Sequence, residues 1–154
     1  MGKHSKILDS WKDYTQNNIP VYHVIKSSKY GVFHGIVIPC PQDYNNINDW
    51  DGYRFAERKC DIQIIKRKAA IMREHIKGME IVLNTLTNKY NSTSTPLPDS
   101  NEFLQDLLYQ INIHQKEYEK VYAQYKYMRD SFRDYTTRII QERIKLRERK
   151  NNQN

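Results

Sequence analysis

The stretch LQDLLYQINIHQKEYEKVYAQYKYMRDSFRDYTTRIIQERIKL, residues 104–146, decides the fold of this chain. Apolar side chains recur in it at alternating steps of three and four residues, with His114 as a polar member that can fix the register of helix pairing. This spacing keeps one stripe of an α-helix turned toward a partner helix. It predicts a helix over about residues 100–150, whose stripe contains Leu104, Leu107, Ile111, Tyr118, Val121, Tyr125, Met128, Phe132, Tyr135 and Ile139.

A second stripe of the same kind runs through residues 50–90 and predicts another long helix. Arg58 is the residue that interrupts it. We call the two stripes together the heptad seam. Its members in the first helix are Phe55, Ile62, Ile65, Met72, Ile76, Met79, Leu83 and Leu86.

The segment between the two helices, NSTSTPLPDS at residues 91–100, contains two prolines and short hydroxylated side chains. These residues cannot continue a helix, so a loop is predicted at 91–99. Asp99 and Glu102 have the spacing of a capping box, which places the start of the second helix at about Ser100. A loop this short predicts an antiparallel helical hairpin. Seam partners should then have residue numbers that add up to about 190, such as Phe55 with Tyr135.

The N-terminal segment, residues 1–48, has a different pattern. Residues 5–14, SKILDSWKDY, have apolar side chains at helical spacing and predict a short helix. Two runs rich in β-branched residues, Val21–Lys26 and Gly31–Ile38, predict a β-hairpin. Residues 49–150 should form the two-helix stalk, and residues 151–154 a polar tail. The fold class is mainly α: a long antiparallel helical hairpin, coiled-coil-like, with a small N-terminal β-hairpin element.

The composition limits the cellular setting. Two cysteines imply no disulfide framework and favour a reducing compartment. The N-terminus lacks the apolar run of a signal peptide, and no stretch approaches the ~20 apolar residues of a membrane span. The abundance of Lys, Asn, Ile and Tyr is typical of AT-rich genomes, including many viruses. We expect a cytoplasmic protein, or a virion component if the source is viral, with no membrane association.

The sequence contains few of the motifs that mark catalytic, cofactor or metal sites. No phosphate-binding loop, dinucleotide fingerprint or nucleophile elbow is present. An acid at position 49 or 51 followed by Glu57 and Lys59 imitates a nuclease pattern, but on a helix those two side chains diverge by about 200°. His23, His34, Cys40 and Cys60 do not have the ligand spacing of a zinc site. We therefore expect no enzymatic activity, no cofactor and no small-molecule substrate.

The stretch NDWDGYRFAERKCD, residues 48–61, instead predicts the start of the first long helix, with Asp49 or Asp51 as its N-cap. Gly52 should allow a close approach by the linker or the second helix. Arg58 should face Phe132 in a cation–π contact. Glu57 and Asp61 form a same-sign pair one turn apart.

The net charge of +7 is concentrated in the two helix halves away from the loop. We call these residues the basic patch: Arg54, Arg58, Lys59, Lys66, Arg67, Lys68, Arg129, Arg133, Arg138, Arg143, Lys145, Arg147, Arg149 and Lys150. Such a patch can dock an acidic protein surface or nucleic-acid phosphates.

The main hypothesis is a non-enzymatic structural or interaction protein that assembles with itself or with other chains, such as a viral (phage) virion or assembly component. Long seams and a marginal hairpin leave apolar surface that two helices cannot fully bury. The alternatives are a small basic nucleic-acid-binding accessory protein and a mobile-element inhibitor of a host enzyme.

Overall fold

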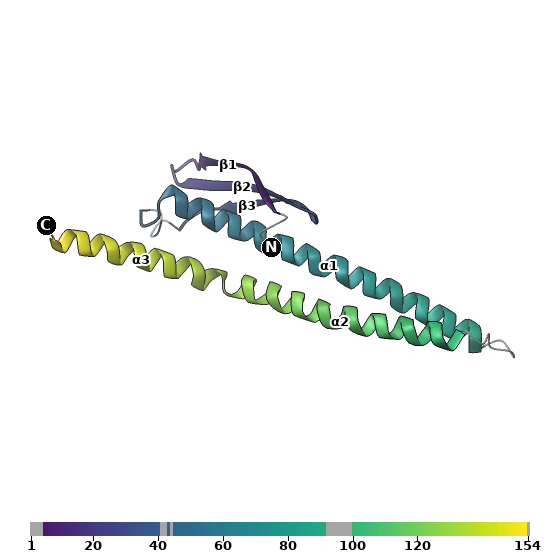
Figure 1. Ribbon diagram of the computed structural model, residues 1–154. Helices are drawn as coiled ribbons and strands as arrows, with labels where there is room; N and C mark the ends of the chain where they lie inside the picture. The colour runs from purple at the N-terminus through teal and green to yellow at the C-terminus, as the bar shows by residue number, and fades with distance from the viewer. Residues whose placement is uncertain (1–4, 41–42, 44, 92–99, 154) are drawn as a thin grey trace. The chain divides into compact units, whose positions relative to one another are not determined.

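The computed structural model describes residues 5–40, 43, 45–91 and 100–153. As the heptads predict, the chain is mainly helical and carries a small antiparallel sheet toward its N-terminus (Figure 1). The elements are, in order, β1 (Lys6–Tyr14), β2 (Pro20–Ser28), β3 (Gly31–Val37), α1 (Asp49–Asn91), α2 (Ser100–Asp130) and α3 (Phe132–Gln153).

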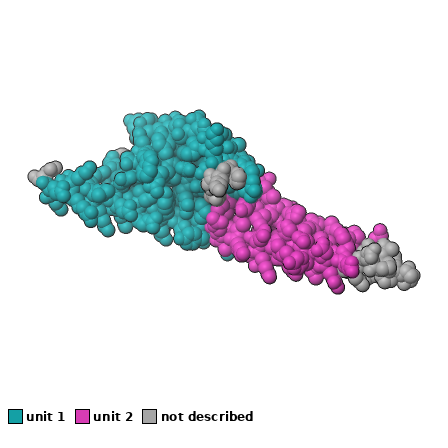
Figure 2. All heavy atoms as spheres, in the orientation of Figure 1, with its two compact units in different colours: residues 1–64, 126–154 teal, residues 65–125 magenta. Residues whose placement is uncertain are grey.

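The chain divides into two compact units (Figure 2). Unit 1 comprises residues 1–64 and 126–154, and unit 2 comprises residues 65–125. Unit 1 therefore contains the sheet, the beginning of α1, the end of α2 and all of α3.

The sheet has three strands in the order β1-β2-β3, and all its pairs are antiparallel. The predicted hairpin is its β2–β3 half, whose turn ends at Gly31 with φ of 131°, in the region that favours glycine. The predicted short helix at residues 5–14 is wrong, because these residues form β1. Strand β1 pairs with β2 from Lys6 opposite Ser27 to Tyr14 opposite Pro20. This pairing overrides the helical spacing.

Two other expectations also need correction, and a third is largely untested. The predicted second helix is divided at Ser131 into α2 and α3. Hydrogen bonds from Ser131 N to Tyr127 O and from Tyr135 N to Ser131 O, both 2.9 Å, flank this residue, so the interruption is short. Residues 151–153 extend α3 rather than forming a tail. The predicted loop at 91–99 lies outside the described residues except for Asn91, which ends α1.

The start of α1 is capped by Asn48 rather than by Asp49 or Asp51. Asn48 Oδ1 accepts a hydrogen bond from Asp51 N at 2.8 Å, and Asp51 Oδ2 accepts one from Asn48 N at 3.4 Å. This reciprocal arrangement is a capping box. It places the buried carboxylate of Asp51 at the positive end of the helix dipole.

The core of unit 1 lies between one face of the sheet, the first turns of α1, and α3. Two glycines permit this contact. A Cβ at Gly35 would lie 2.0 Å from the carbonyl oxygen of Ala56, and one at Gly52 would lie 2.4 Å from the ring of Tyr22. Gly52 thus admits β2, not the linker or the second helix. The buried core residues are Tyr22, Val24, Val37, Phe55, Ala56, Cys60 and Ile139.

Unit 2 pairs the remainder of α1 with most of α2. The rings of His75 and His114 lie 5.1 Å apart, and the guanidinium of Arg73 lies 5.7 Å from the ring of Tyr118. Ile76 and Ile111 are buried. In unit 1, the rings of Phe55 and Tyr135 are 5.9 Å apart. These contacts run in the predicted antiparallel register, and every member of the heptad seam is buried or half-buried.

Candidate interaction site

Several members of the basic patch pack against aromatic rings or backbone of unit 1. The guanidinium of Arg54 lies 4.4 Å from the ring of Trp50. That of Arg58 lies 5.3 Å from the ring of Tyr135, so its aromatic partner is not the predicted Phe132. Lys59 Nζ donates a hydrogen bond to Ile36 O at 2.9 Å. These cations contribute to the packing of unit 1 rather than standing free in solvent.

Arg143 of α3 is held by a buried carboxylate at the start of α1. Its Nε donates to Asp51 Oδ2 at 2.9 Å and its Nη2 donates to Asp51 Oδ1 at 3.0 Å. Asp51 is 0% exposed, and this bidentate pair holds the pKa of Arg143 above its usual value. The pair holds α3 to the start of α1, although Asp51 and Arg143 are 92 positions apart in the sequence.

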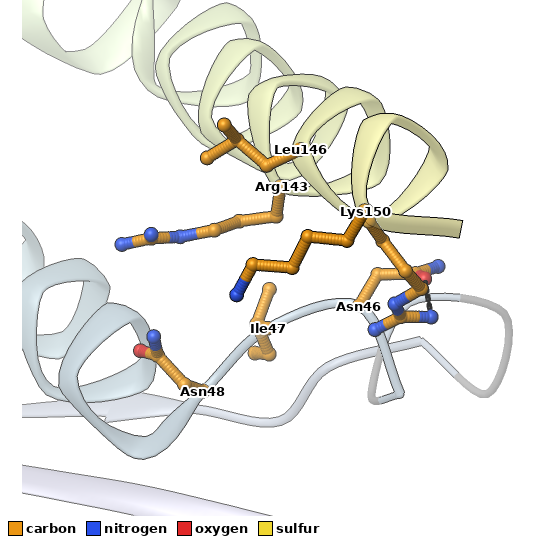
Figure 3. A pocket seen from close by; sticks show the side chains of 7 residues that line it. Asn46, Ile47, Asn48, Arg143, Leu146 and Lys150 are labelled. Atoms are coloured by element: carbon orange, nitrogen blue, oxygen red, sulfur yellow. Dashed lines mark hydrogen bonds between the residues drawn. The ribbon is translucent and has the colours of Figure 1, made fainter. Parts of the chain in front are cut away.

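A pocket of about 300 Å³ lies beside this pair, lined by Asn46, Ile47, Asn48, Arg143, Leu146, Arg147 and Lys150 (Figure 3). Arg147 is also engaged, because it donates to Asn46 Oδ1 at 3.1 Å and to Asn45 O at 2.5 Å. The side chain of Lys150 extends into the pocket from the end of α3 (Figure 3). Two of the three cations here therefore already have oxygen partners.

The rest of the patch is more exposed. In unit 2, Lys66 and Arg67 are exposed and Lys68 is half-buried. In unit 1, the exposed members are Arg129, which pairs with Asp130, and Arg133, Arg138, Lys145, Arg147, Arg149 and Lys150. Arg138, Lys145 and Arg149 are spaced by seven and four residues, so they share one face of α3.

A buried ion-pair cluster joins the sheet to α1. Lys26 of β2 lies on the same face as Tyr22 and Val24, and its Nζ is 2.8 Å from both Glu57 Oε1 and Asp61 Oδ1. Burial lowers the pKa of Lys26, but the hydrogen bonds to Asp61 and Glu57 outweigh it, so the pKa lies above its usual value. The same-sign pair of α1 thus has a cation between its members.

The sheet also contacts the first turn of α1 through polar groups. Tyr22 donates its hydroxyl hydrogen to Asp49 Oδ1 at 2.9 Å, and Lys12 Nζ lies 3.0 Å from the same oxygen. Burial and this hydrogen bond raise the pKa of Tyr22 to about 12. Hydrogen bonds from Lys12 and Tyr22 lower the pKa of Asp49.

The opposite face of the sheet carries a histidine pair. His23 Nδ1 and His34 Nε2 are 2.9 Å apart, His23 Nε2 is 3.2 Å from Asp13 Oδ2, and the ring of Trp11 stacks on His23 at 4.6 Å. The two cysteines do not join them. Cys40 is exposed.

Cys60 is buried on the α1 side, where its Sγ donates to Val24 O and burial raises its pKa. Within the described ranges, no three His, Cys, Asp or Glu side chains are grouped as metal ligands would be.

This face also exposes apolar side chains. Val32, His34 and Ile36 follow one another at every second position of β3, so they share this face. Val32 is 62% exposed and Ile36 is 40% exposed. Ile38, just beyond β3, is also exposed. Ile7 and Leu8 of β1 are exposed as well, but Ile7 pairs with Lys26 and so belongs to the face turned toward α1. Sequence reasoning missed this surface because β1 was predicted as a helix. Knowledge of the β1–β2 register would have paired Trp11 with His23.

The two edges of the sheet differ. Gln63 Nε2 and Lys59 Nζ of α1 donate hydrogen bonds to the carbonyl oxygens of His34 and Ile36 in β3, at 3.2 and 2.9 Å. Carbonyl groups along this edge are thereby satisfied by a helix. Strand β1 forms the other edge of the sheet. Among the residues that the structure describes, no strand pairs with its outer side.

No family model, curated protein or solved structure that was compared with this chain matches it. Among the described residues, no helix has both the length and the apolar character needed to cross a membrane.

Proposed function

We propose that this chain is a non-enzymatic structural protein that assembles with further copies of itself through the exposed face of its sheet. The observation that carries the proposal is the exposure of Val32 and Ile36 on a sheet whose other face is already packed on α1. Exposed apolar side chains gathered on one face of a sheet are a feature of protein contact sites. Whether the assembly belongs to a virion stays a prediction from composition.

A second copy is the favoured occupant because of how charge is distributed. The strand registers place one lysine, Lys6, on this face, opposite Ser27, together with the two carboxylates of Asp9 and Asp13. In a chain of net charge +7, two copies repel each other least on a surface where carboxylates balance the cations. A two-fold pairing of identical faces also requires a patch that can contact itself, as apolar side chains can.

Size-exclusion chromatography with light scattering at low and high salt tests this. We expect oligomers that persist at high salt, because apolar contacts are not screened. The double variant Val32→Lys with Ile36→Lys should shift the protein to monomer. Ile81→Lys is the matched control, because Ile81 is an apolar side chain on unit 2 that is 65% exposed. A chain that stays monomeric up to about 100 µM, or oligomers unaffected by the double variant, would contradict the proposal.

Nucleic-acid binding is the second candidate, and the exposed row of Arg138, Lys145 and Arg149 favours it. Such a row would contact phosphates and bind with a strong salt dependence. Charge reversal at Lys145 and Arg149 should abolish binding to nonspecific DNA or RNA without changing the oligomeric state. Reversal of Arg143 would be a poor test, since it would also break the ion pair with Asp51.

A further inference from the structure

A second cavity in unit 1 lies at the interruption between α2 and α3. It has a volume of about 450 Å³ and is lined by Arg58, Tyr127, Ser131, Asp134, Tyr135 and Arg138. This size is within the range of small-molecule sites in proteins. Its walls combine two guanidinium groups, a hydroxyl group, a carboxylate and two phenol rings.

The two guanidinium groups lack anionic partners. Arg58 Nε is buried and has no hydrogen-bond partner, and neither Arg58 nor Arg138 lies within 4.0 Å of a carboxylate oxygen among the described residues. This includes Asp134, although it lines the same cavity. The cavity therefore has a net positive charge, and one of its lining residues, Arg58, has a buried N–H group without an acceptor.

Arg58 is also out of place in the helix pattern. It is the residue that interrupts the apolar seam of the first helix, where a leucine or methionine would pack against the facing helix. A buried donor without an acceptor costs free energy that an apolar side chain would not. The Nη–H groups at the end of the guanidinium are further donors, and they suit the oxygens of an oxyanion.

We propose that this cavity binds the phosphate group of a nucleotide, with Arg58 and Arg138 on the phosphate oxygens and the ring of Tyr127 beside the base. A phosphate monoester has three terminal oxygens, enough for both guanidinium groups to contact, whereas a carboxylate has two. The cavity is larger than a phosphate alone requires, and Tyr127, 71% exposed, offers a ring face on which a base can stack. This site is independent of the proposed assembly through the sheet.

Isothermal titration of the full chain at low salt tests the proposal, with adenosine monophosphate, adenosine, inorganic phosphate and a short single-stranded oligonucleotide as probes. We expect the monophosphate to bind with a Kd of about 10–100 µM, phosphate to bind more weakly, and adenosine not to bind. Arg58→Gln and Arg138→Gln should each weaken the binding at least about tenfold. Arg133→Gln is the matched control, because Arg133 is exposed on α3 and does not line the cavity.

The oligonucleotide separates a free nucleotide from one carried by a strand. Monophosphate binding that is lost in Arg58→Gln and kept in Arg133→Gln supports the site, whether or not the oligonucleotide also binds. Oligonucleotide binding without monophosphate binding, weakened equally by all three substitutions, overturns it and favours contacts spread along α3. The absence of binding by every phosphate compound overturns it as well.

A thermal melt separates a binding role of Arg58 from a structural one. Arg58→Met restores an apolar seam residue and removes the unpaired donor, so the melting temperature should rise by about 2–4 °C while monophosphate binding is lost. If Arg58→Met lowers the melting temperature and Arg138→Gln leaves ligand binding unchanged, the proposal is overturned.

Discussion

Lys26 provides a quantitative test of how the sheet is held to α1. Its ammonium group donates to two carboxylates at 2.8 Å, and its side chain is only 9% exposed. Replacing it with methionine retains most of the aliphatic stem but leaves Glu57 and Asp61 one turn apart without a cation. The carboxylate side chains of Glu57 and Asp61 are 35% and 18% exposed, so water can solvate them in part.

The magnitude follows from these values. Removing one partner of a fully buried ion pair costs about 3–5 kcal/mol, and an exposed pair contributes about 0–1 kcal/mol. With carboxylates of intermediate exposure, Lys26→Met should lower the free energy of unfolding by about 2–3 kcal/mol. This corresponds to a fall in melting temperature of about 5–10 °C for a chain of this size.

Urea unfolding followed by tryptophan fluorescence is the assay, because both tryptophans, Trp11 and Trp50, belong to unit 1. The triple variant Lys26→Met, Glu57→Gln, Asp61→Asn should recover more than half of the loss, since no unpaired charge remains. A loss below about 0.5 kcal/mol for the single variant, or a triple variant no more stable than the single one, would refute the reasoning.

Two further predictions concern the same packing. Gly35→Ala should destabilise unit 1 by about 3 kcal/mol or more in a denaturant titration, because its Cβ would lie 2.0 Å from the carbonyl oxygen of Ala56. Gly78→Ala, with nothing within 4 Å of its Cβ, is the control and should stabilise its helix by about 0.5–1 kcal/mol; equal effects would contradict this account. The folded chain keeps the proton of Tyr22 more tightly than the unfolded chain, so stability should fall as pH rises from 10.0 to about 12. Tyr22→Phe should flatten that part of the stability curve, and an unchanged slope would show that Asp49 and burial do not hold the proton.

The helices could be predicted because their signal is local and repeated. Steps of three and four residues recur often enough that single exceptions, such as Arg58 and His114, do not hide them. The register followed from the short loop between the helices. The interruption at Ser131 left no comparable signal, since the seam continues through Met128 and Phe132 on either side of it.

Strand β1 could not be recognised in the same way. A strand's signal is a strict two-residue alternation, and the register of β1 shifts between Ile7 and Asp9, so the alternation is broken. What remains is an apolar spacing that also fits a helix. The exposed sheet face, with Trp11 on His23, depends on this strand and was missed with it.

Contacts of the basic patch depended on tertiary structure even more strongly. The pair between Asp51 and Arg143 joins residues 92 positions apart, and no local pattern specifies it. The burial of Lys26, in contrast, could have been predicted from the sequence. Tyr22, Val24 and Lys26 lie at every second position of β2, so they share its apolar face. A buried lysine on that face requires a nearby carboxylate, and the structure supplies those of Glu57 and Asp61.

The carbonyl groups of His34 and Ile36 that accept hydrogen bonds from α1 limit how copies of this chain can join by strand pairing. A sheet with two open edges can add strands at both sides and grow into a fibre. Here α1 occupies carbonyl groups on the β3 side, so within the described part of the chain the β1 side is the one open to an incoming strand. Two chains joined edge to edge through β1 would each have used their open side, and the product would be a closed pair of six strands that cannot grow further.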